Sequence, residues 1–461
     1  MKRIALLNPP GKKSYFRDYY CAKVAKASYY YHPIDFVFLS GILSEKYDVS
    51  IVDAIAGKYS DDKCLGKIRV ASPQCVIALV SGPSFIEDME FLKEMKATIN
   101  CTLICCGDIF RDCGRDVIEK YSFIDAVLLD FSTSHIIRFL DCAEGNEIPN
   151  VIYRYSGNIV NGGECHEAGG FDIPTPQHSL FNSKDYIFPF ARHLKFASIM
   201  TDFGCPYSCD FCPVGSLKYK TRPVESVLEE MTQISKLGIR ELYVRDQTFG
   251  ASKRRTMQLL DEMIERKFNF SWTCLSRIDV LDEEILYKMK AAGCHTIMIG
   301  VESSNSEILD KCGKGTGKCN VRERIELIKS FGFDINGFFM IGFPGESLES
   351  IDNTVQYALS LPIDYVSFNM VAPRHGTELR RSCIDNNVYN VGMKETESTS
   401  EATEWIGASV SGEDLNKIKK KAVRSFYLRP RFLVKRVFGI KSFDQFLIYA
   451  KMGISLLRNN L

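Results

Sequence analysis

Short apolar strands alternate with helices along two stretches of this 461-residue chain. In the first stretch, residues 1–140, the predicted strands cover 4–8, 49–54, 75–81, 102–107 and 125–130. A helix is predicted over 33–47, between the first two of these strands. Strands as uniformly apolar as these are covered on both faces, so the sheet should be parallel and doubly wound. The predicted fold class is therefore α/β, with a Rossmann-like domain at the front.

The second stretch, residues 195–383, repeats a strand, a loop and a helix. Its predicted strands cover 196–201, 240–246, 270–276, 295–301, 334–341 and 364–370. Gly238, Gly293 and Gly332 each stand between a predicted helix and the next strand, which is typical of helix C-termini. In repeats of this kind the functional groups lie at the C-terminal ends of the strands.

Residues 141–194 separate the two stretches and are rich in glycine and proline, which predicts an interdomain linker. The run VIYRYSGNIVNGG within the linker indicates a small hairpin with its turn at 156–158. Beyond the second stretch, residues 384–461 divide into a polar loop or lid and a basic, helical C-terminal region that starts near Glu413.

The composition fits an intracellular enzyme. The chain holds 17 cysteines, and its first residues, MKRIALLNPP, lack the apolar core of a secretory signal, so we expect a cytoplasmic protein with reduced thiols. A net charge of +1 argues against bulk nucleic-acid binding. The sequence has no run of about 18 apolar residues of the kind that spans a membrane.

Three cysteines, Cys205, Cys209 and Cys212, lie close together in the run GCPYSCDFCPVG. Their CxxxCxxC spacing brings three thiolates into one small volume, one ligand short of a closed zinc site or an ordinary four-cysteine cluster. The prolines bar a continuing helix, and the glycines let the backbone wrap closely around a bulky ligand. The pattern predicts a metal centre with an open position. The alternatives are a chance cluster of buried thiols and a zinc site.

At this point the sequence resembles the radical S-adenosylmethionine (SAM) superfamily, whose CxxxCxφC loop has an aromatic residue before its last cysteine, here Phe211. The resemblance implies a [4Fe–4S] cluster on Cys205, Cys209 and Cys212, with one iron free to bind SAM. One electron from the cluster then cleaves SAM to methionine and a 5′-deoxyadenosyl radical, which abstracts hydrogen from an unreactive carbon. The resemblance also implies that residues 195–383 fold as a partial (β/α)6 barrel.

Polar residues follow the predicted barrel strands at positions that match family motifs for SAM. They are Asp246 and Gln247, Arg277 and Asp279, and Glu302 and Ser303. The resemblance implies that these side chains bind the ribose hydroxyls and the amino group of SAM, and paired carboxylate acceptors suit a diol. The run NGFFMIGFPGES resembles the motif that lies against adenine, with a tight turn at Gly342, Pro344 and Gly345. Singly, each polar residue could instead form a salt bridge at a loop edge.

Placed before such a barrel, residues 1–140 resemble the cobalamin-binding domain of cobalamin-dependent radical SAM enzymes. The resemblance implies a corrinoid held against the strand ends, at Asn8, Pro9, Ser81, Gly82, Gly107, Asp108 and Ser132. No Asp-x-His-x-x-Gly motif is present, which implies cobalamin bound without a protein histidine ligand. The run Gly107-Asp108-Ile109-Phe110 stands where many relatives carry Gly-Gly-x-His, so a packing platform without cofactor is the alternative. No G-x-G-x-x-G follows the first strand, which disfavours a dinucleotide site.

The sixth predicted barrel strand ends in VAPRHGTEL, which places Arg374 and His375 near the barrel mouth. These two are the catalytic candidates, as a substrate contact or as a group that moves a proton near neutral pH. The alternative is a surface turn that carries two polar residues.

These features predict a cobalamin-dependent radical SAM enzyme, similar to the class B radical SAM methyltransferases, that methylates an unactivated carbon. One alternative is a cobalamin-dependent cyclisation or oxidation without methyl transfer. Another, from a different class, is a non-catalytic iron–sulfur sensor or scaffold. The expected partners are a small-molecule or lipid-like substrate and an electron donor such as flavodoxin or ferredoxin, and no nucleic acid.

Cations alternate with aromatic residues in the C-terminal region, residues 413–461. This alternation suits the headgroup plane of an anionic membrane. The alternative is a helical cap that packs its apolar face on the barrel and leaves its lysines in solvent. The first interpretation places the protein at the inner face of the membrane as a peripheral protein, and the second leaves it in the cytoplasm.

Overall fold

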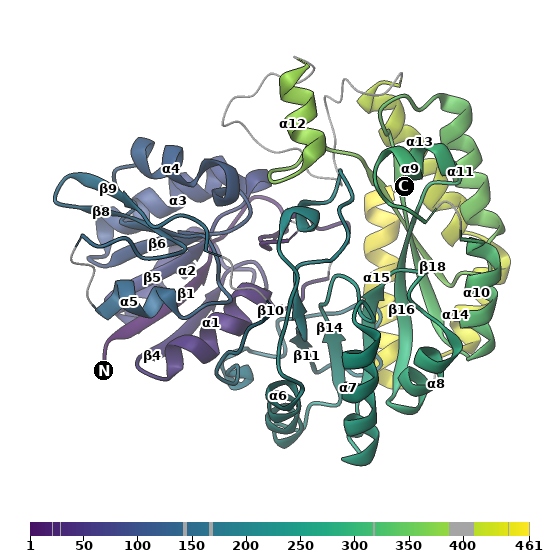
Figure 1. Ribbon diagram of the computed structural model, residues 1–461, viewed down its shortest axis with the longest axis horizontal. Helices are drawn as coiled ribbons and strands as arrows, with labels where there is room; N and C mark the ends of the chain where they lie inside the picture. Colours follow the sequence, from purple (N-terminus) through teal and green to yellow (C-terminus); the bar gives the residue numbers. More distant parts are fainter. Residues whose placement is uncertain are drawn as a thin grey trace.

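The computed structural model describes residues 1–461 except 21, 28, 142–144, 166–168, 317–318, 387–409, 441 and 461. A front domain and a barrel domain lie side by side in Figure 1, with the C-terminal helices (yellow) against the barrel. The polar loop or lid expected within 384–411 lies almost entirely outside the described residues.

The front domain is built on a seven-stranded sheet in the order β4-β1-β5-β6-β7-β8-β9. Its strands are β1 (Arg3–Asn8), β4 (Asp48–Asp53), β5 (Cys75–Leu79), β6 (Thr102–Cys106), β7 (Ala126–Leu128), β8 (Val151–Tyr155) and β9 (Asn158–Asn161). The helices are α1 (Ile34–Ser44), α2 (Asp61–Ala71), α3 (Phe85–Thr98), α4 (Phe110–Lys120) and α5 (His135–Asp141). The first five strands in the order are parallel, and β5 is buried along its whole length. The predicted α/β class with a parallel sheet is confirmed.

The hairpin of the linker extends this sheet. β8 and β9 pair antiparallel around Ser156 and Gly157, and β8 continues the sheet beside β7. Both turn residues have positive φ, 48° and 80°, as two-residue hairpin turns require. Val151, Ile152 and Tyr153 of β8 are buried, so the hairpin shares the core of the front domain.

The barrel domain is a six-stranded, all-parallel sheet in the order β11-β14-β15-β16-β17-β18. Its strands are β11 (Phe196–Ile199), β14 (Glu241–Val244), β15 (Ser271–Ser276), β16 (Cys294–Glu302), β17 (Asp334–Ile341) and β18 (Tyr365–Met370). The helices α6 (Val224–Lys236), α7 (Lys253–Glu265), α8 (Glu283–Ala291), α9 (Ser306–Lys311), α10 (Val321–Ser330) and α11 (Leu348–Ser360) cover it. Gly238, Gly293 and Gly332 follow α6, α8 and α10. Their φ angles are 71°, 94° and 75°, which only glycine adopts without strain.

The connection from β1 to α1 reaches across to the barrel. It contains a small hairpin of β2 (Tyr15–Phe16) and β3 (Lys23–Val24), and we call residues 12–32 the strap. Lys26 of the strap donates to Ser367 Oγ, Phe368 O and Asn369 Oδ1 of β18, at 2.6–2.9 Å. The strap therefore belongs to both domains.

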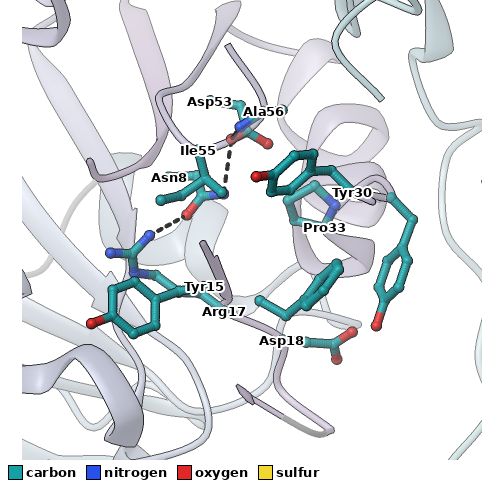
Figure 2. Close-up of a pocket in the computed structure, with 11 residues that line it drawn as sticks. Asn8, Tyr15, Arg17, Asp18, Tyr30, Pro33, Asp53, Ile55 and Ala56 are labelled. Carbon is teal, nitrogen blue, oxygen red and sulfur yellow. Dashed lines mark hydrogen bonds between the residues drawn. The ribbon is translucent and has the colours of Figure 1, made fainter. Parts of the chain in front are cut away.

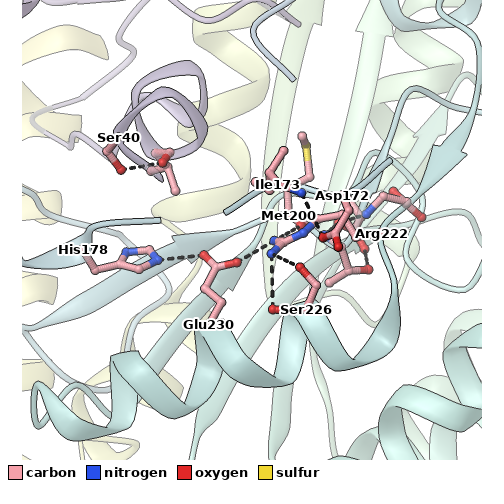
Figure 3. A network of polar contacts seen from close by, with 12 residues as sticks. Ser40, Asp172, Ile173, His178, Met200, Arg222, Ser226 and Glu230 are labelled. Atoms are coloured by element: carbon pink, nitrogen blue, oxygen red, sulfur yellow. Dashed lines mark hydrogen bonds and ion pairs between the residues drawn. The ribbon is translucent and has the colours of Figure 1, made fainter. Parts of the chain in front are cut away.

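The linker is fixed to the barrel by a buried chain of charges, drawn in Figure 3. His178 Nε2 lies 2.7 Å from Glu230 Oε1 of α6, and Arg222 Nη1 lies 2.5 Å from Glu230 Oε2. Arg222 Nη1 also donates to Met200 O, just after β11, at 3.0 Å. On the other side, Ser40 Oγ of α1 accepts from Gln177 N at 2.9 Å. The linker thus holds α1 and α6 in place.

Among the described residues, four helices follow the barrel sheet, and the last three of them cover its open edge at β18, while the first lies above the space between the two domains (Figure 1). They are α12 (Glu378–Asp385), α13 (Gly412–Tyr427), α14 (Pro430–Phe438) and α15 (Phe443–Asn460). The Tyr427 hydroxyl donates to Val366 O at 2.7 Å and accepts from Val366 N at 3.1 Å, so it satisfies backbone groups of the edge strand β18. Within the described part of the chain, no helix is both long and apolar enough to cross a membrane.

Candidate active site

The three cysteines lie in one loop at the C-terminal end of β11. β12 (Asp202–Phe203) and β13 (Lys220–Thr221) pair antiparallel and close the base of this loop, and β10 (Gly169–Gly170) of the linker pairs with β13. Cys205, Cys209 and Cys212 are all half-buried. The Cys212 N–H donates to Cys209 O at 3.0 Å, which tightens the turn between them.

Two glycines let this cysteine loop fold so tightly. Gly204 has a φ of 78°, and a Cβ there would lie 2.6 Å from Lys218 O. A Cβ on Gly215 would lie 3.3 Å from the backbone of Cys209. η3 (Pro213–Ser216), a short 3-10 turn, follows the last cysteine. A larger residue at Gly204 would be strained by its φ and would push the two ends of the loop apart.

Positive charge lies next to Cys209. Arg277 Nη1, at the end of β15, is 3.9 Å from Cys209 Sγ, and the guanidinium lies 3.8 Å from the centre of the Tyr207 ring. Burial raises the pKa of the Cys209 thiol, and the charges of Lys314 and Arg277 oppose that rise. Thiolates bind metals, so cations at this position favour the form of Cys209 that a cluster needs.

The chemistry of the cysteine loop is set by its three thiols. Among the described residues, no three His, Cys, Asp or Glu side chains converge closely enough to hold one metal ion. The donor set of three half-buried thiols is the set that a [4Fe–4S] cluster with one open iron would use.

Two other loops pack against the cysteine loop. The rings of Phe211 and Phe343 meet edge to face, with centroids 5.5 Å apart, so the predicted aromatic residue touches the GFPGE turn. The Asp210 N–H donates to Cys312 O at 3.0 Å. Cys312 is buried, and its thiol donates to Leu309 O, so it supports the loop as a core residue.

The predicted residues after β14 lie at the base of the cysteine loop. The Asp246 carboxylate is buried and accepts hydrogen bonds from Thr201 N and Thr201 Oγ1, both at 2.6 Å, and from Asp202 N at 3.2 Å. Gln247 Nε2 donates to Arg245 O at 3.1 Å. In this structure Asp246 therefore organises the chain that leads into the loop, three residues before Cys205.

Glu302, at the end of β16, has an unusual backbone conformation. Its φ is 67°, which costs a non-glycine residue on the order of 1 kcal/mol. Its Oε1 lies 3.1 Å from Nζ of Lys314, a buried lysine, and a Cβ on Gly300 would collide with both side chains. Ser303 Oγ lies 3.3 Å from Thr354 Oγ1 of α11. The buried ion pair with Lys314 holds the Glu302 carboxylate at the strand end, despite the backbone strain there.

The GFPGE turn after β17 is held by its own glutamate. Gly342 and Gly345 have φ of 86° and 80°, and Pro344 lies between them. Glu346 Oε2 accepts from Gly342 N at 2.7 Å and from Phe343 N at 2.9 Å. The turn therefore has a fixed shape, in agreement with a backbone that a flat ligand can approach.

Two buried carboxylate oxygens in this area lack a hydrogen-bond partner among the described residues. They are Asp202 Oδ1, at the base of the cysteine loop, and Glu346 Oε1, at the GFPGE turn. Burial raises the pKa of both carboxyl groups. An unpaired buried acceptor is costly, so each oxygen is a place for a ligand donor, and the hydroxyl and amino groups of SAM are such donors.

The predicted strand ends of the front domain form a continuous polar rim, part of which Figure 2 shows. Asn8 Nδ2 donates to Asp53 Oδ1 at 2.9 Å, and Arg17 Nη1 of the strap donates to Asn8 Oδ1 and Pro9 O. The pocket at this point has a volume of about 20 Å³, much smaller than a corrinoid. The strap therefore occupies the space over β1.

The remaining rim residues bond to one another. Ser81 N donates to Asp88 Oδ2 and Gly82 N donates to Asp108 Oδ1, both at 3.1 Å. Gly107 has a φ of 140° and passes so close to Val80 that a Cβ would lie 1.9 Å from its carbonyl oxygen. Ser132 N donates to Asp130 Oδ1 at 2.7 Å. The rim thus offers hydroxyl, amide and carboxylate groups, which are the kinds of group that can form hydrogen bonds with the amide side chains at the edge of a corrinoid.

The catalytic candidates Arg374 and His375 contact the front domain. Arg374 donates to Ala22 O of the strap and lies 3.7 Å from Asp108 Oδ2 of the rim. His375 Nδ1 lies 3.1 Å from Asp112 Oδ2 of α4. Both residues are buried. Neither residue therefore lies in an exposed surface turn, which was the alternative interpretation. In this structure their contacts join the barrel to the front domain.

Sequence reasoning missed two groups of residues. Lys314 lies in a Gly-Lys-Gly run with no apolar neighbour, which resembles a solvent loop, yet its side chain is buried against Glu302. Asp18 of the strap forms a buried ion pair with Arg245, whose guanidinium also lies 4.4 Å from the centre of the Tyr31 ring. The signal available for the strap was its density of tyrosines, which is high for a loop.

Comparison with known proteins identifies the barrel. Residues 201–358, which begin just before the cysteine loop and end in α11, match the family model described as the radical SAM superfamily. The barrel is a radical SAM domain. The match includes the cysteine loop, the strand ends after β14, β15 and β16, and the GFPGE turn. The chain therefore contains a radical SAM domain, as the sequence predicted.

The similarity to known radical SAM proteins extends beyond this domain. An uncharacterized methyltransferase from Pyrococcus horikoshii is 28% identical over 418 residues, which cover 88% of this chain and 90% of that protein. The structure of the radical SAM methyltransferase TsrM from Kitasatospora setae, with cobalamin and a [4Fe–4S] cluster bound, has a TM-score of 0.66 at 19% identity and covers 84% of this chain and 78% of TsrM.

A second solved structure matches the whole chain. The cobalamin-dependent radical SAM enzyme OxsB, with aqua-cobalamin and SAM bound, has a TM-score of 0.71 at 14% identity and covers 100% of this chain and 72% of OxsB. At these identities the likeness shows the fold. The front domain and the radical SAM domain together have the fold of cobalamin-dependent radical SAM enzymes.

Proposed function

We propose that this chain binds a [4Fe–4S] cluster, SAM and cobalamin and methylates an unactivated carbon of a small-molecule or lipid-like substrate. The observation that carries the proposal is the placement of the cysteine loop opposite the polar rim of the front domain. Lys220 of β13, at the base of the loop, lies 3.1 Å from Asp130 Oδ2 of the rim, and both side chains are buried.

When bound, the cluster would supply the electron that cleaves SAM, and the corrinoid would supply the methyl group. Cys205, Cys209 and Cys212 would hold the cluster, with Arg277 and Lys314 as compensating charges beside Cys209. Asp202, Glu302 and Glu346 would accept hydrogen bonds from SAM, and the rim residues from Asn8 to Ser132 would face the corrinoid. The packing of the front domain on the barrel would exclude water from the space between them, which radical chemistry requires.

The test is anaerobic reconstitution with iron and sulfide, followed by incubation with SAM and dithionite. We expect 5′-deoxyadenosine from the wild-type protein and less than about one hundredth of that amount from Cys209→Ser, since the cluster would lose a ligand. Cys383→Ser serves as the matched control, because Cys383 is a buried cysteine of α12 outside the cysteine loop. A protein with a full cluster that forms no 5′-deoxyadenosine would favour the sensor or scaffold hypothesis.

A second measurement separates methyl transfer from the other reactions. With hydroxocobalamin added during reconstitution, a methyltransferase should form S-adenosylhomocysteine together with 5′-deoxyadenosine. Formation of 5′-deoxyadenosine alone, in the presence of bound corrinoid, would favour cyclisation or oxidation. Flavodoxin or ferredoxin in place of dithionite tests the proposed electron donor. If no corrinoid absorption remains after gel filtration, the cobalamin part of the proposal fails.

A further inference from the structure

The C-terminal segment, residues 413–461, differs sharply from the rest of the chain in charge. It holds 12 of the 58 lysines and arginines but only 3 of the 57 acidic residues, a net charge of +9. The whole chain has a net charge of +1, so the remaining residues carry −8. This cationic segment therefore stands on an otherwise acidic protein, and its charge favours an anionic partner.

Large apolar side chains are exposed on the same segment. They are Leu428, Leu433, Val434, Phe438, Phe443, Phe446 and Ile454. Phe438 is 85% exposed and Phe443 is 71% exposed, on either side of the short connection between α14 and α15. The rings of Phe443 and Phe446 stack with centroids 6.2 Å apart. All exposed phenylalanines among the described residues lie here, and such grouping marks an interaction surface.

Contacts on the opposite side fix the orientation of α14. Arg436 Nη1 donates to Tyr365 OH at 2.7 Å, and Phe432 packs against the core of the barrel. Residues two positions apart in a helix point to nearly opposite sides, so an inward Arg436 turns Val434 and Phe438 outward. The apolar side chains are thus presented by a helix that is anchored to the barrel, and they are not a frayed end.

We infer that α14 and the first turns of α15 dock on an anionic lipid surface. Exposed phenylalanine and leucine side chains enter the boundary between headgroups and acyl chains, while cations such as Arg431 and Lys451, both exposed, approach lipid phosphates. A nucleic acid would use the charge but would leave the apolar side chains in water. A second copy of the chain would bring two segments of +9 together, and their repulsion opposes that arrangement.

Co-sedimentation with lipid vesicles tests this docking surface in the full-length protein. We expect binding to vesicles with about one third phosphatidylglycerol, little binding to pure phosphatidylcholine, and weaker binding as salt is raised. The variant Phe438→Ser/Phe443→Ser should lower the vesicle partition coefficient about tenfold, since it removes two inserting rings. Tyr287→Ser, at an aromatic residue of α8 that is 68% exposed, is the matched control and should bind like the wild type.

The charge contribution is tested separately. Arg431→Gln/Lys451→Gln should lower binding to anionic vesicles about tenfold, whereas Lys93→Gln/Arg254→Gln, at exposed positions of α3 and α7, should not. Because all these side chains are exposed, unchanged thermal midpoints should show that the variants fold. No binding to anionic vesicles at low salt would overturn the inference. So would a wild-type dimer that the double phenylalanine variant converts to a monomer, because a second copy would then cover this surface.

Discussion

Glu230 is the residue on which the linker, the cysteine loop and the barrel meet. Its fully buried carboxylate lies between His178 of the linker and Arg222, which follows β13 at the base of the cysteine loop. Burial would raise the pKa of Glu230, but the charge of Arg222 and the hydrogen bond from His178 outweigh it and hold the pKa below its usual value. The ionised form is thus the form that the fold stabilises.

Glu230→Gln should destabilise the protein by about 3 kcal/mol, because it leaves Arg222 buried without its partner charge. The thermal midpoint measured by circular dichroism should fall by several degrees. Glu119→Gln is the matched control, since Glu119 forms an ion pair of 2.9 Å with Arg115 on an exposed face of α4. That control should stay within about 0.5 kcal/mol of the wild type.

Glu230 also makes the stability of the folded protein depend on pH. A carboxyl group whose pKa is lower in the folded protein stabilises it fully above the ordinary value, here 4.5, and loses that contribution as the pH falls through the folded value. The stability difference between the wild type and Glu230→Gln should therefore shrink as the pH falls below about 4.5. A difference that stays constant down to pH 3.5 would contradict the assigned role of the charge.

Among the helices and strands, the sequence predicts those whose apolar residues are buried in the core. The strands of both sheets were predicted within a few residues, since β5 is apolar throughout and β17 ends in the apolar run Phe338–Ile341 before Gly342. The strap was not predicted, because its stability comes from contacts far away in sequence, such as the bond from Tyr19 OH to Leu129 O. The partners of Lys314 and His375 are hidden for the same reason.

The strap should move when a corrinoid binds. It fills the space over β1, where the pocket holds about 20 Å³, and it is tied down by Arg17 and by the Asp18–Arg245 ion pair. Hydrogen exchange with and without hydroxocobalamin is the measurement. We expect faster exchange at Tyr30, whose N–H group bonds to Ile187 O of the linker, because the strap would leave this partner.

Helix α10 is the internal control for this experiment, because it lies on the outer side of the barrel and should exchange equally in both states. Corrinoid that stays bound through gel filtration while the strap exchanges at its original rate would contradict the prediction. The corrinoid would then bind without displacing the strap.

At the scale of the whole molecule, the first turn of α4 joins the two domains at the cysteine loop. Arg111 donates to Pro213 O at 2.7 Å and to Ser216 Oγ, both in η3 directly after Cys212. Asp112 Oδ2 accepts from Gly376 N at 2.7 Å, in the loop after β18. A Cβ on Gly376 would lie 2.7 Å from the Arg111 guanidinium, so these contacts leave no spare room. The front domain therefore covers the outer side of the cysteine loop.

This cover should protect the proposed cluster. The variant Arg111→Met/Asp112→Ala removes the contacts to η3 and to Gly376 without changing a residue of the barrel. We expect the reconstituted cluster to lose its visible absorption several times faster in air than in the wild type, because solvent and oxygen would reach the loop. Arg115→Gln/Asp116→Asn, at exposed positions one turn later in α4, is the matched control. Equal rates of bleaching in the two variants would show that the front domain does not shield the cluster, and the interdomain contacts would then serve stability alone.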